Sequence, residues 1–187
     1  MFKKLIPSRD WLVYDDNPIM HQKNEDLTFP LNEKDIEIIS KMLSYVDASY
    51  NGLDKEYKIK PGIGIAANQL GYTKKIIYIH LDDENGVEQK YLLANPKLIK
   101  SSSRKMCLST GEGCLSVKKD HKGLSVRNAV VYVSAIDIFT QKEIEIRATG
   151  ILSACLQHEI DHTNNLFYYH RIDTMNPYKK GDDWEII

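Results

Sequence analysis

Hydrophobic and polar residues follow two different periods along this chain, and each period predicts its own kind of element. In segment 33–48 the apolar residues recur at the spacing of one helix face: Ile36, Ile39, Leu43 and Val46. Asn32 precedes this segment as a candidate N-cap, and acidic residues crowd the first turn. The pattern predicts an amphipathic helix over residues 33–48.

A period of two dominates the middle of the chain and predicts two β-hairpins. The first joins segments 75–81 and 90–95 through the turn-rich residues 82–86. The second joins segments 128–139 and 142–148, where β-branched residues alternate with polar ones. Both hairpins imply antiparallel pairing.

From about Gly150 the period returns to that of a helix, and the density of apolar residues predicts that this helix is largely buried. Residues 184–187 are expected to dock as a terminal strand. Strands followed by a long helix favour the α+β class over alternating βαβ units. We therefore expect mostly antiparallel sheets packed around a central C-terminal helix, in a single domain over residues 1–187.

Composition narrows the class of protein. The chain has 187 residues and a formal net charge of −1, so it lacks the charge expected for binding nucleic acid or an anionic membrane. No apolar stretch approaches the roughly 18 residues of a membrane span, and the N-terminal apolar run stops at Pro7, too early for a signal peptide. Three irregularly spaced cysteines fit a reducing compartment. We expect a cytoplasmic protein that binds neither a specific nucleic-acid sequence nor a membrane.

The segment 158–162 reads HExxH and carries the strongest chemical signal in the chain. Residues four apart share one helix face, so His158 and His162 can bind a single metal ion. Glu159 points about 100° away from His158, close enough to act as a general base on a metal-bound water. Two histidines leave the site one protein ligand short of the three that are usual in catalytic sites.

Spacing tests the downstream candidates for the third ligand. A zinc endopeptidase of the HExxHxxGxxH type needs glycine and histidine where this chain has Asn165 and Tyr168. His170 lies eight residues beyond His162, past the expected helix end at residues 164–165, and matches no known spacing. Glu185 could act as a distant carboxylate ligand, but it lies in the apolar segment 184–187. The third ligand is therefore sought upstream.

Cys114 lies upstream in the irregular segment 112–116, where a thiolate beside a divalent cation would bind as an anion. Cys155 competes with it, because it shares a helix face with His158. Positions 155, 158 and 162 span nearly two turns, however, which is an awkward arrangement around one ion, and Cys155 fits better as an apolar wall. The residues predict Cys114, His158 and His162 as ligands, with a water in the fourth position.

Three segments resemble motifs of the peptide deformylase family, and they occur in the family's order. Residues 62–69 resemble GxGφAAxQ, residues 112–116 match EGCLS, and residues 157–162 match QHExDH. The resemblance extends from about residue 16 to the C-terminus. The long connection at 49–60 and the apolar C-terminal residues are similar to the form found in Gram-positive bacteria and their wall-less relatives.

The chain departs from the family pattern at three places. Asn68 and Lys118 stand where proline is frequent, and segment 163–165 lacks the glycine that usually follows the metal-binding helix. None of these changes removes a chemical group that the reaction needs, so they bear on loop geometry alone.

The resemblance implies a metal-dependent hydrolase that removes the formyl group from the N-formylmethionine of nascent chains. Glu159 would take a proton from the water and pass it to the departing amine, while the side-chain amide of Gln69 and the N–H of Leu115 stabilise the oxyanion. The alternatives are a zinc endopeptidase and a catalytically inactive binding module on the same fold. The first lacks its downstream ligand, and the second would normally have lost a ligand or Glu159.

The small residues of segment 62–67 could admit a formyl group and exclude a bulkier acyl group. We expect six residues to bind the substrate: Ile63, Gly64, Gly113, Ile151, Ala154 and Cys155. An extended peptide could pair through its backbone with residues 61–65, which would give little selectivity beyond methionine.

The identity of the metal depends on the resemblance. The ligand types alone would suit zinc, whereas the resemblance implies one Fe²⁺ ion per chain in the cell, replaceable by Zn²⁺, Ni²⁺ or Co²⁺. It also implies N-formylmethionyl nascent peptides as partners, met at the ribosome exit, and we expect a monomer.

Residues outside the motifs receive simpler interpretations. Arg127 is either a partner of Asp161 or Glu112, or an ordinary surface residue. The remaining histidines are interpreted as scattered surface or core residues: His21, His80, His121 and His170.

Overall fold

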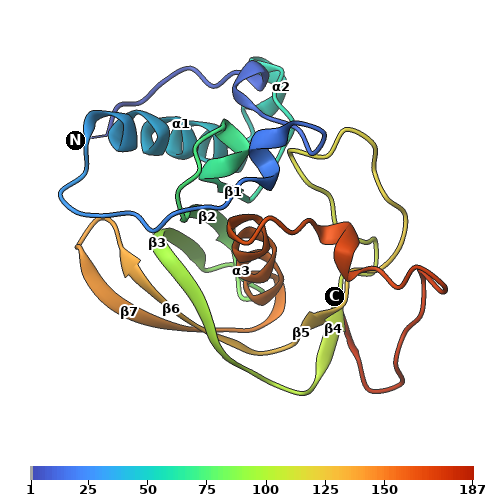
Figure 1. Cartoon of the computed structure of the whole chain (residues 1–187). Coiled ribbons are helices and arrows are strands. Elements are labelled where there is room, and N and C mark those ends of the chain that lie inside the picture. The colour runs from blue at the N-terminus through green and yellow to red at the C-terminus, as the bar shows by residue number, and fades with distance from the viewer. Residues whose placement is uncertain (1) are drawn as a thin grey trace.

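A five-stranded sheet forms the framework of the protein, which the computed structural model describes from residue 2 to residue 187 (Figure 1). Its strands run in the order β1, β2, β3, β6, β7, and each neighbouring pair is antiparallel. Their bounds are Gly64–Ala66, Ile76–Asp82, Glu88–Ser101, Val131–Asp137 and Lys142–Ala148. The β2–β3 and β6–β7 pairs are the two hairpins that the sequence predicts.

A smaller sheet has the order β5 (Arg127–Asn128), β4 (Lys105–Cys107), β8 (Glu185–Ile186), and β8 runs parallel to β4. The expected docking of the C-terminal residues as a strand is confirmed. The expected strand over 128–139 is wrong in its first residues, because β5 belongs to this smaller sheet and β6 begins only at Val131. Alternation continues through both strands, so it does not reveal where the chain passes from one sheet to the other.

Helix α1 (Glu33–Tyr50) begins at the predicted residue and extends slightly beyond the predicted end. Asn32 Oδ1 accepts hydrogen bonds from the N–H groups of Lys34 and Asp35, and the Asp35 carboxylate accepts the N–H of Asn32, which completes a capping box. The short helix α2 (Asp54–Tyr57) follows it. The face of α1 that packs against the sheet includes four fully buried side chains: Ile39, Met42, Tyr45 and Val46.

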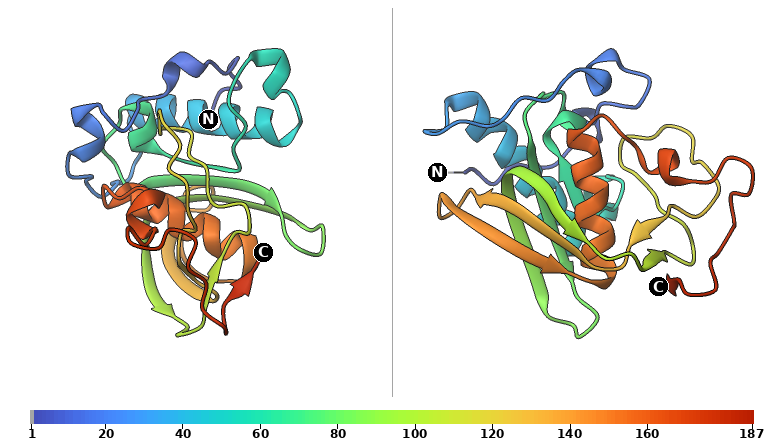
Figure 2. Two further views of the ribbon diagram at one scale, coloured as in Figure 1. Left: turned by 90° about the vertical axis from the view of Figure 1, so that its right-hand side faces the viewer. Right: turned by 60° about the horizontal axis from the view of Figure 1, so that its bottom comes forward.

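Helix α3 (Gly150–Thr163) lies on the opposite face of the sheet from α1 (Figure 2). Alternate residues of β2 divide between the two faces. Ile76 and Tyr78 pack in the cluster with α1, whereas Ile77 and Ile79 pack in the cluster with α3. Almost every residue of α3 is buried, so the predicted α+β fold with a central C-terminal helix is confirmed.

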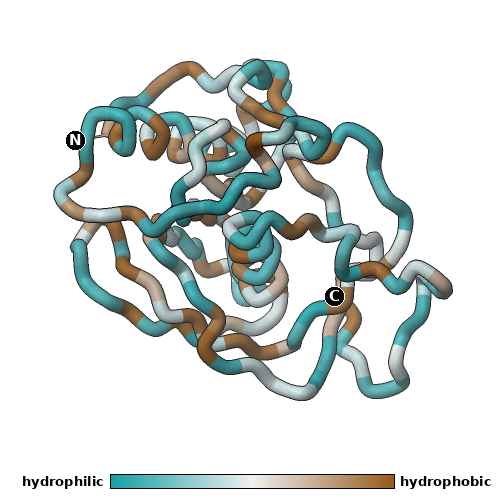
Figure 3. Tube along the Cα trace, viewed as in Figure 1, coloured by the Kyte–Doolittle hydropathy of each residue, from teal (hydrophilic) through white to brown (hydrophobic). Residues whose placement is uncertain are grey.

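Among the described residues, the connections contain four 3₁₀ turns: η1 (Arg9–Trp11), η2 (Pro18–His21), η3 (Ala67–Leu70) and η4 (Tyr168–Arg171). Hydrophobic residues are interspersed along the strands and α3, whereas the outer loop drawn yellow in Figure 1, which contains the exposed residues 118–122, is mostly hydrophilic (Figure 3). Within residues 2–187, no helix has the length and apolar character needed to cross a membrane.

Candidate metal centre and its cavity

The three predicted ligands lie together at the middle of the protein. Successive turns of α3 carry His158 and His162, and the segment between β4 and β5 carries Cys114. The Sγ of Cys114 is 3.2 Å from Nε2 of His162, and the two Nε2 atoms are 3.3 Å apart. All three potential ligand atoms lie within 4.8 Å of one another.

These distances fit a divalent metal ion. In a tetrahedral site with metal–nitrogen bonds of about 2.0–2.1 Å, two imidazole nitrogens lie about 3.3 Å apart. Cys114 and His162 are buried and His158 is partly buried. A thiolate and two imidazoles facing one point are a set that soft or borderline cations prefer. The residues present therefore fit one ion.

Burial affects the two histidines differently. Burial would lower the pKa of His158, but hydrogen bonds with Cys114 and Glu112 outweigh it and hold the pKa well above its usual value. Burial and the positive charge of His158 hold the pKa of His162 well below its usual value. A cation can bind only to a deprotonated imidazole nitrogen, so the raised pKa of His158 opposes metal binding as the pH falls.

Glu112 holds His158 in place. Its Oε2 lies 2.8 Å from Nδ1 of His158, so Nε2 faces Cys114 and His162. Burial would raise the pKa of Glu112, but the hydrogen bonds from Arg127 and His158 outweigh it and lower the pKa to about 2. From the sequence, Glu112 was named only as a possible partner of Arg127. Its position two residues before the proposed ligand Cys114 could have indicated a role in the metal site.

Arg127 is buried, which excludes the surface interpretation. Its Nε and Nη2 donate to the two carboxylate oxygens of Glu112 at 2.8 and 2.9 Å, and its Nη1 donates to Asp161. Arg171 donates two further hydrogen bonds to Asp161. The two arginines and two carboxylates connect β5, α3 and the segment before Cys114.

Glu159 lies on α3 beside the ligand atoms, and its carboxylate faces β1. Burial raises the pKa of Glu159 to about 7. Its Oε2 is buried and has no hydrogen-bond partner among residues 2–187. Gly64 makes room for the other oxygen, because a Cβ at that position would lie 2.7 Å from Glu159 Oε1 and 3.0 Å from Cys155 Sγ. The carboxylate is thus free to accept a proton within the site.

Gln69 and Leu115 place two donors near the sulfur of Cys114. Gln69 Oε1 accepts the N–H of Ala66 at 2.7 Å, which turns its amide Nε2 toward Cys114 Sγ at 3.6 Å. The backbone N–H of Leu115 belongs to the residue that follows Cys114, and no acceptor within residues 2–187 is bonded to it. Both groups remain able to donate to a ligand.

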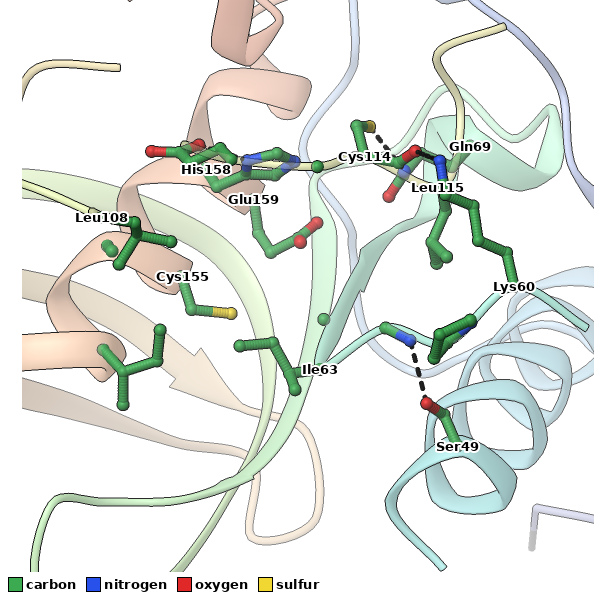
Figure 4. Close-up of a pocket in the computed structure, with 17 residues that line it drawn as sticks. Ser49, Lys60, Ile63, Gln69, Leu108, Cys114, Leu115, Cys155, His158 and Glu159 are labelled. Atoms are coloured by element: carbon green, nitrogen blue, oxygen red, sulfur yellow. Dashed lines mark hydrogen bonds and ion pairs between the residues drawn. The ribbon is translucent and has the colours of Figure 1, made fainter. Parts of the chain in front are cut away.

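A cavity of about 360 Å³ opens onto these groups (Figure 4); we call it the site cavity. All six residues that the sequence predicts to bind substrate line it: Ile63, Gly64, Gly113, Ile151, Ala154 and Cys155. Glu159, Gln69 and Leu115 line it as well, together with Cys114 and His158. His162 lies behind them, outside the lining. Ser49, Lys60 and Leu108 also line the cavity and were not predicted.

Comparison with known proteins identifies the family in which this arrangement of residues occurs. The family model described as polypeptide deformylase matches residues 9–178. The chain belongs to this family. It is 63% identical over 187 residues to the peptide deformylase of Malacoplasma penetrans, covering 100% of both chains. It is 50% identical over 181 residues to that of Mycoplasma genitalium, covering 97% of this chain and 93% of the relative.

Solved deformylase structures share the fold. The peptide deformylase of Synechococcus elongatus in complex with actinonin superposes with a TM-score of 0.70 at 27% identity, over 87% of this chain and 80% of that chain. The peptide deformylase of Acinetobacter baumannii with bound Met-Ala-Ser superposes with a TM-score of 0.69 at 21% identity, over 91% and 100%. These matches confirm the fold of the deformylase family for this chain.

One departure from the deformylase pattern is accommodated at the end of α3. Asn165, at the position of the usual glycine, adopts a left-handed conformation with φ of 60°. The N–H of Asn165 donates to the His162 carbonyl at 3.1 Å, and the N–H of Leu166 donates to the Asp161 carbonyl at 2.9 Å, which is a Schellman motif. Asparagine tolerates this conformation better than other residues with a Cβ, so the turn is kept.

The other two departures add hydrogen bonds that proline could not make. The side-chain amide of Asn68 donates to the carbonyl of His162 at 2.7 Å and so binds η3 to the end of α3. The backbone N–H of Lys118 donates to Asp15 at 3.3 Å, and its ammonium donates to Asp16 at 2.6 Å. Both residues attach loops that border the deformylase site.

The remaining histidines lie outside the ligand set, as expected. His80 is buried on β2 between the carboxylates of Asp47 and Glu88, at 2.7 Å from each. His170 accepts the N–H of Phe167, and His121 stacks on Tyr169. None of these three histidines belongs to the cluster formed by Cys114, His158 and His162.

Proposed function

We propose how this chain performs the metal-dependent deformylation of formylated nascent peptides that its family carries out. The proposal rests on one observation: three potential ligand atoms, a buried carboxylate and the N–H donors of Gln69 and Leu115 converge on one end of the site cavity. Cys114, His158 and His162 would hold the ion. When bound, a divalent ion there supplies Lewis acidity that polarises the formyl carbonyl and acidifies water.

The residues of the chain carry the remaining steps. Glu159 accepts a proton from the attacking water and donates it to the amine that leaves. Burial raises its pKa to about 7 in the metal-free protein, which makes the carboxylate a stronger proton acceptor than an exposed glutamate. Gln69 Nε2 and the Leu115 N–H donate hydrogen bonds to the formyl oxygen as negative charge develops on it. Loss of one such donor typically lowers the rate by about 10²–10³.

The shape of the site cavity supports a formyl group followed by methionine. Gly64 brings backbone close to Glu159, which leaves room for hydrogen on the far side of the carbonyl carbon and little for a methyl group. Ile151, Ala154 and Cys155 on α3, with Ile63 opposite them, offer an apolar slot for the methionine side chain. Gly113 borders the same space.

The peptide beyond methionine would bind along β1. This strand is at the end of the sheet order, and β2 is its one pairing partner within the described part of the chain. Its other edge borders the site cavity, so an extended peptide can add as a strand through residues 61–65. Backbone pairing of this kind depends little on the side chains of the bound peptide, so it gives little sequence selectivity.

We propose Fe²⁺ as the ion in the cell, with Zn²⁺, Ni²⁺ or Co²⁺ as replacements. The ligand set suits several of these ions, so availability and oxidation decide among them. Metal analysis and activity after anaerobic purification test this proposal. Turnover by the zinc form alone would contradict it.

We further propose that the chain acts as a single catalytic domain and as a monomer, in the cytoplasm, where formylated nascent chains leave the ribosome. Light scattering after size-exclusion chromatography tests the monomer. Cosedimentation with ribosomes at several salt concentrations tests the encounter with nascent chains, since a charge-driven contact would weaken with salt.

The central experiment follows release of a free amine from formyl-Met-Ala by metal-loaded protein. Acetyl-Met-Ala is the matched control, because it adds only a methyl group at the carbonyl carbon. We expect turnover of the formyl peptide and little turnover of the acetyl peptide. No turnover of formyl-Met-Ala by any of the four metal forms would refute the proposed function.

A further inference from the structure

Lys60 is a charged residue in the wall of the site cavity to which the proposed chemistry assigns no role. Its Nζ donates a hydrogen bond to the carbonyl oxygen of Cys114 at 2.7 Å. Figure 4 shows its side chain reaching toward Cys114 and Leu115. The nearest carboxylate is that of Asp120, at 3.9 Å on a largely exposed side chain, so this ion pair is a weak constraint.

The carbonyl that Lys60 contacts belongs to the same peptide group as the Leu115 N–H. A peptide group is planar and conjugated, so fixing its oxygen also fixes the direction of its N–H. A donor on the oxygen draws electron density toward it and strengthens the N–H as a donor, which is the basis of cooperativity in hydrogen-bonded chains. The effect is larger when the donor is charged.

The free end of this peptide group faces the reaction. The Leu115 N–H has no acceptor within residues 2–187, and Leu115 lines the site cavity next to a proposed metal ligand. A cation on one side of the peptide group therefore acts through it on an oxygen bound at the other side.

The backbone around Lys60 is itself held by α1. The hydroxyl of Tyr45, a fully buried residue, donates to the carbonyl of Lys60 at 3.2 Å. Ser49 Oγ accepts the N–H of Gly62 at 2.9 Å. A Cβ at Gly62 would come within 3.0 Å of the Leu115 side chain, so the two segments are in close contact. The backbone from which the Lys60 side chain extends is thus held in place, as a preorganised donor requires.

We propose that Lys60 is a positioning residue that orients and polarises the Cys114–Leu115 peptide group, making the Leu115 N–H a stronger donor to the developing oxyanion. The inference rests on the proposed function, in which that N–H stabilises the transition state. In this proposal Lys60 stabilises the transition state and does not contribute to substrate binding. Loss of Lys60 therefore lowers kcat with little change in KM.

Three variants test the role of Lys60 in turnover. Lys60→Met removes the ammonium and keeps most of the stem, Lys60→Arg restores a cationic donor, and Lys55→Met removes the same charge from exposed α2 as a control. We expect kcat for formyl-Met-Ala to fall on the order of 10-fold in Lys60→Met, less than the 10²–10³ of losing a donor outright. Lys60→Arg recovers most of the rate, and Lys55→Met matches the wild type.

A nuclear magnetic resonance measurement separates polarisation from a general structural effect. Labelling with ¹³C-carbonyl cysteine and ¹⁵N-leucine in the diamagnetic zinc form selects the peptide groups after Cys107, Cys114 and Cys155. A Leu115→Ile variant identifies the Leu115 signal by its loss. We expect Lys60→Met to shift the Leu115 amide proton and nitrogen upfield and Lys60→Arg to reverse the shift, with the other two signals unchanged. Metal content stays at the wild-type level in every variant.

Each outcome bears on one proposal. An inactive wild type refutes the proposed function and leaves the amide shift as the test of Lys60. An active wild type with unchanged kcat in Lys60→Met refutes the inference, as does a fall in kcat with an unmoved Leu115 signal. A rise in KM at constant kcat also refutes it, because that pattern assigns Lys60 to substrate binding.

Discussion

At the scale of a single residue, Glu112 has two structural roles. It accepts hydrogen bonds from His158 and from buried Arg127, so it both aims a proposed ligand and neutralises an internal cation. A buried carboxylate without such partners would have a raised pKa, whereas the pKa of Glu112 falls to about 2. The residue should therefore contribute to stability as well as to the metal site.

We expect Glu112 to dominate the acid sensitivity of the metal-stripped protein. Its folded pKa of about 2 lies below its ordinary value of 4.5, so its stabilising effect is complete above about pH 4.5 and is lost as the pH falls toward 2. The shift corresponds to about 3 kcal/mol. Urea unfolding between pH 2 and 7 should show this loss in the wild type and a much flatter acid slope in Glu112→Gln.

Glu143→Gln is the matched control, because Glu143 is exposed on β7. It should keep the slope of the wild type. Equal slopes in Glu112→Gln and the wild type would show that the pKa of Glu112 is not depressed in the folded state.

Glu159 leads to a prediction about activity. It must be ionised to accept a proton, so kcat/KM should fall as the pH is lowered. The pKa of Glu159 is about 7 without a metal, and a cation beside it lowers that pKa. The acid limb should therefore have a pKa below about 7. Glu159→Gln should bind metal at unchanged stoichiometry and lose nearly all turnover; full activity in this variant would exclude Glu159 as the base.

At the scale of elements, the C-terminal end of α3 is held from several directions. Asn24 and Asn68 donate to its last carbonyls, and the side chain of Asn165 donates to the carbonyls of Met20 and Gln22 at 2.9 and 2.6 Å. These contacts bind the N-terminal segment to the helix that carries both histidines. Residues before the first motif therefore help to fix the position of α3.

Two substitutions at Asn165 separate backbone conformation from side-chain bonding. Asn165→Gly keeps the left-handed conformation and loses the bonds to Met20 and Gln22. Asn165→Ala loses both, so it should be less stable than the glycine variant by about 1 kcal/mol. Urea unfolding of the two proteins measures the difference. Equal stabilities would mean that the turn relaxes out of its left-handed conformation.

The elements that sequence patterns predict well are those with local signals. A cap and a helical period fixed the start of α1, and a change of period marked α3. Sequence patterns did not predict which sheet a strand joins, because that depends on pairing with strands distant in the chain. Alternation did not reveal that β5 and β6 belong to different sheets, since both keep the same period.

The candidate site shows the same division. The ligands and Glu159 stand in motifs whose spacing reflects chemistry, so they could be proposed from sequence. The sequence offered Arg127 as a partner of Asp161 or Glu112 only beside a surface interpretation, and the structure pairs it with both. The contact of Lys60 with the Cys114 carbonyl was not anticipated. No local pattern decides such contacts between distant positions, because they depend on how the sheets and α3 pack.

At the scale of the whole molecule, α3 is both the centre of the core and the holder of two proposed ligands. Metal binding and folding should therefore be linked. We expect the melting temperature to rise with free metal concentration, with a gain of about 2.7 kcal/mol at a concentration 100 times the Kd. Calorimetry of metal-stripped and reloaded protein measures the gain.

Cysteine variants localise this effect. Cys114→Ser should lose most of the metal-dependent gain. Cys107→Ser, at a buried cysteine of β4, should retain it even if its overall stability is lower. A gain that persists in Cys114→Ser would place the stabilising ion elsewhere.

The pairing of β8 with β4 has a consequence for how damage far from the site would affect it. The N–H of Ile187 donates to the carbonyl of Cys107, and the Ile187 carbonyl accepts the N–H of Ser109, so residues 185–187 support the segment that leads to Cys114. Proteolytic removal of residues 185–187 would leave every proposed ligand and Glu159 in the chain, yet it would free the segment before Cys114 from this support. The metal centre should therefore be sensitive to clipping at a place that takes no part in the chemistry.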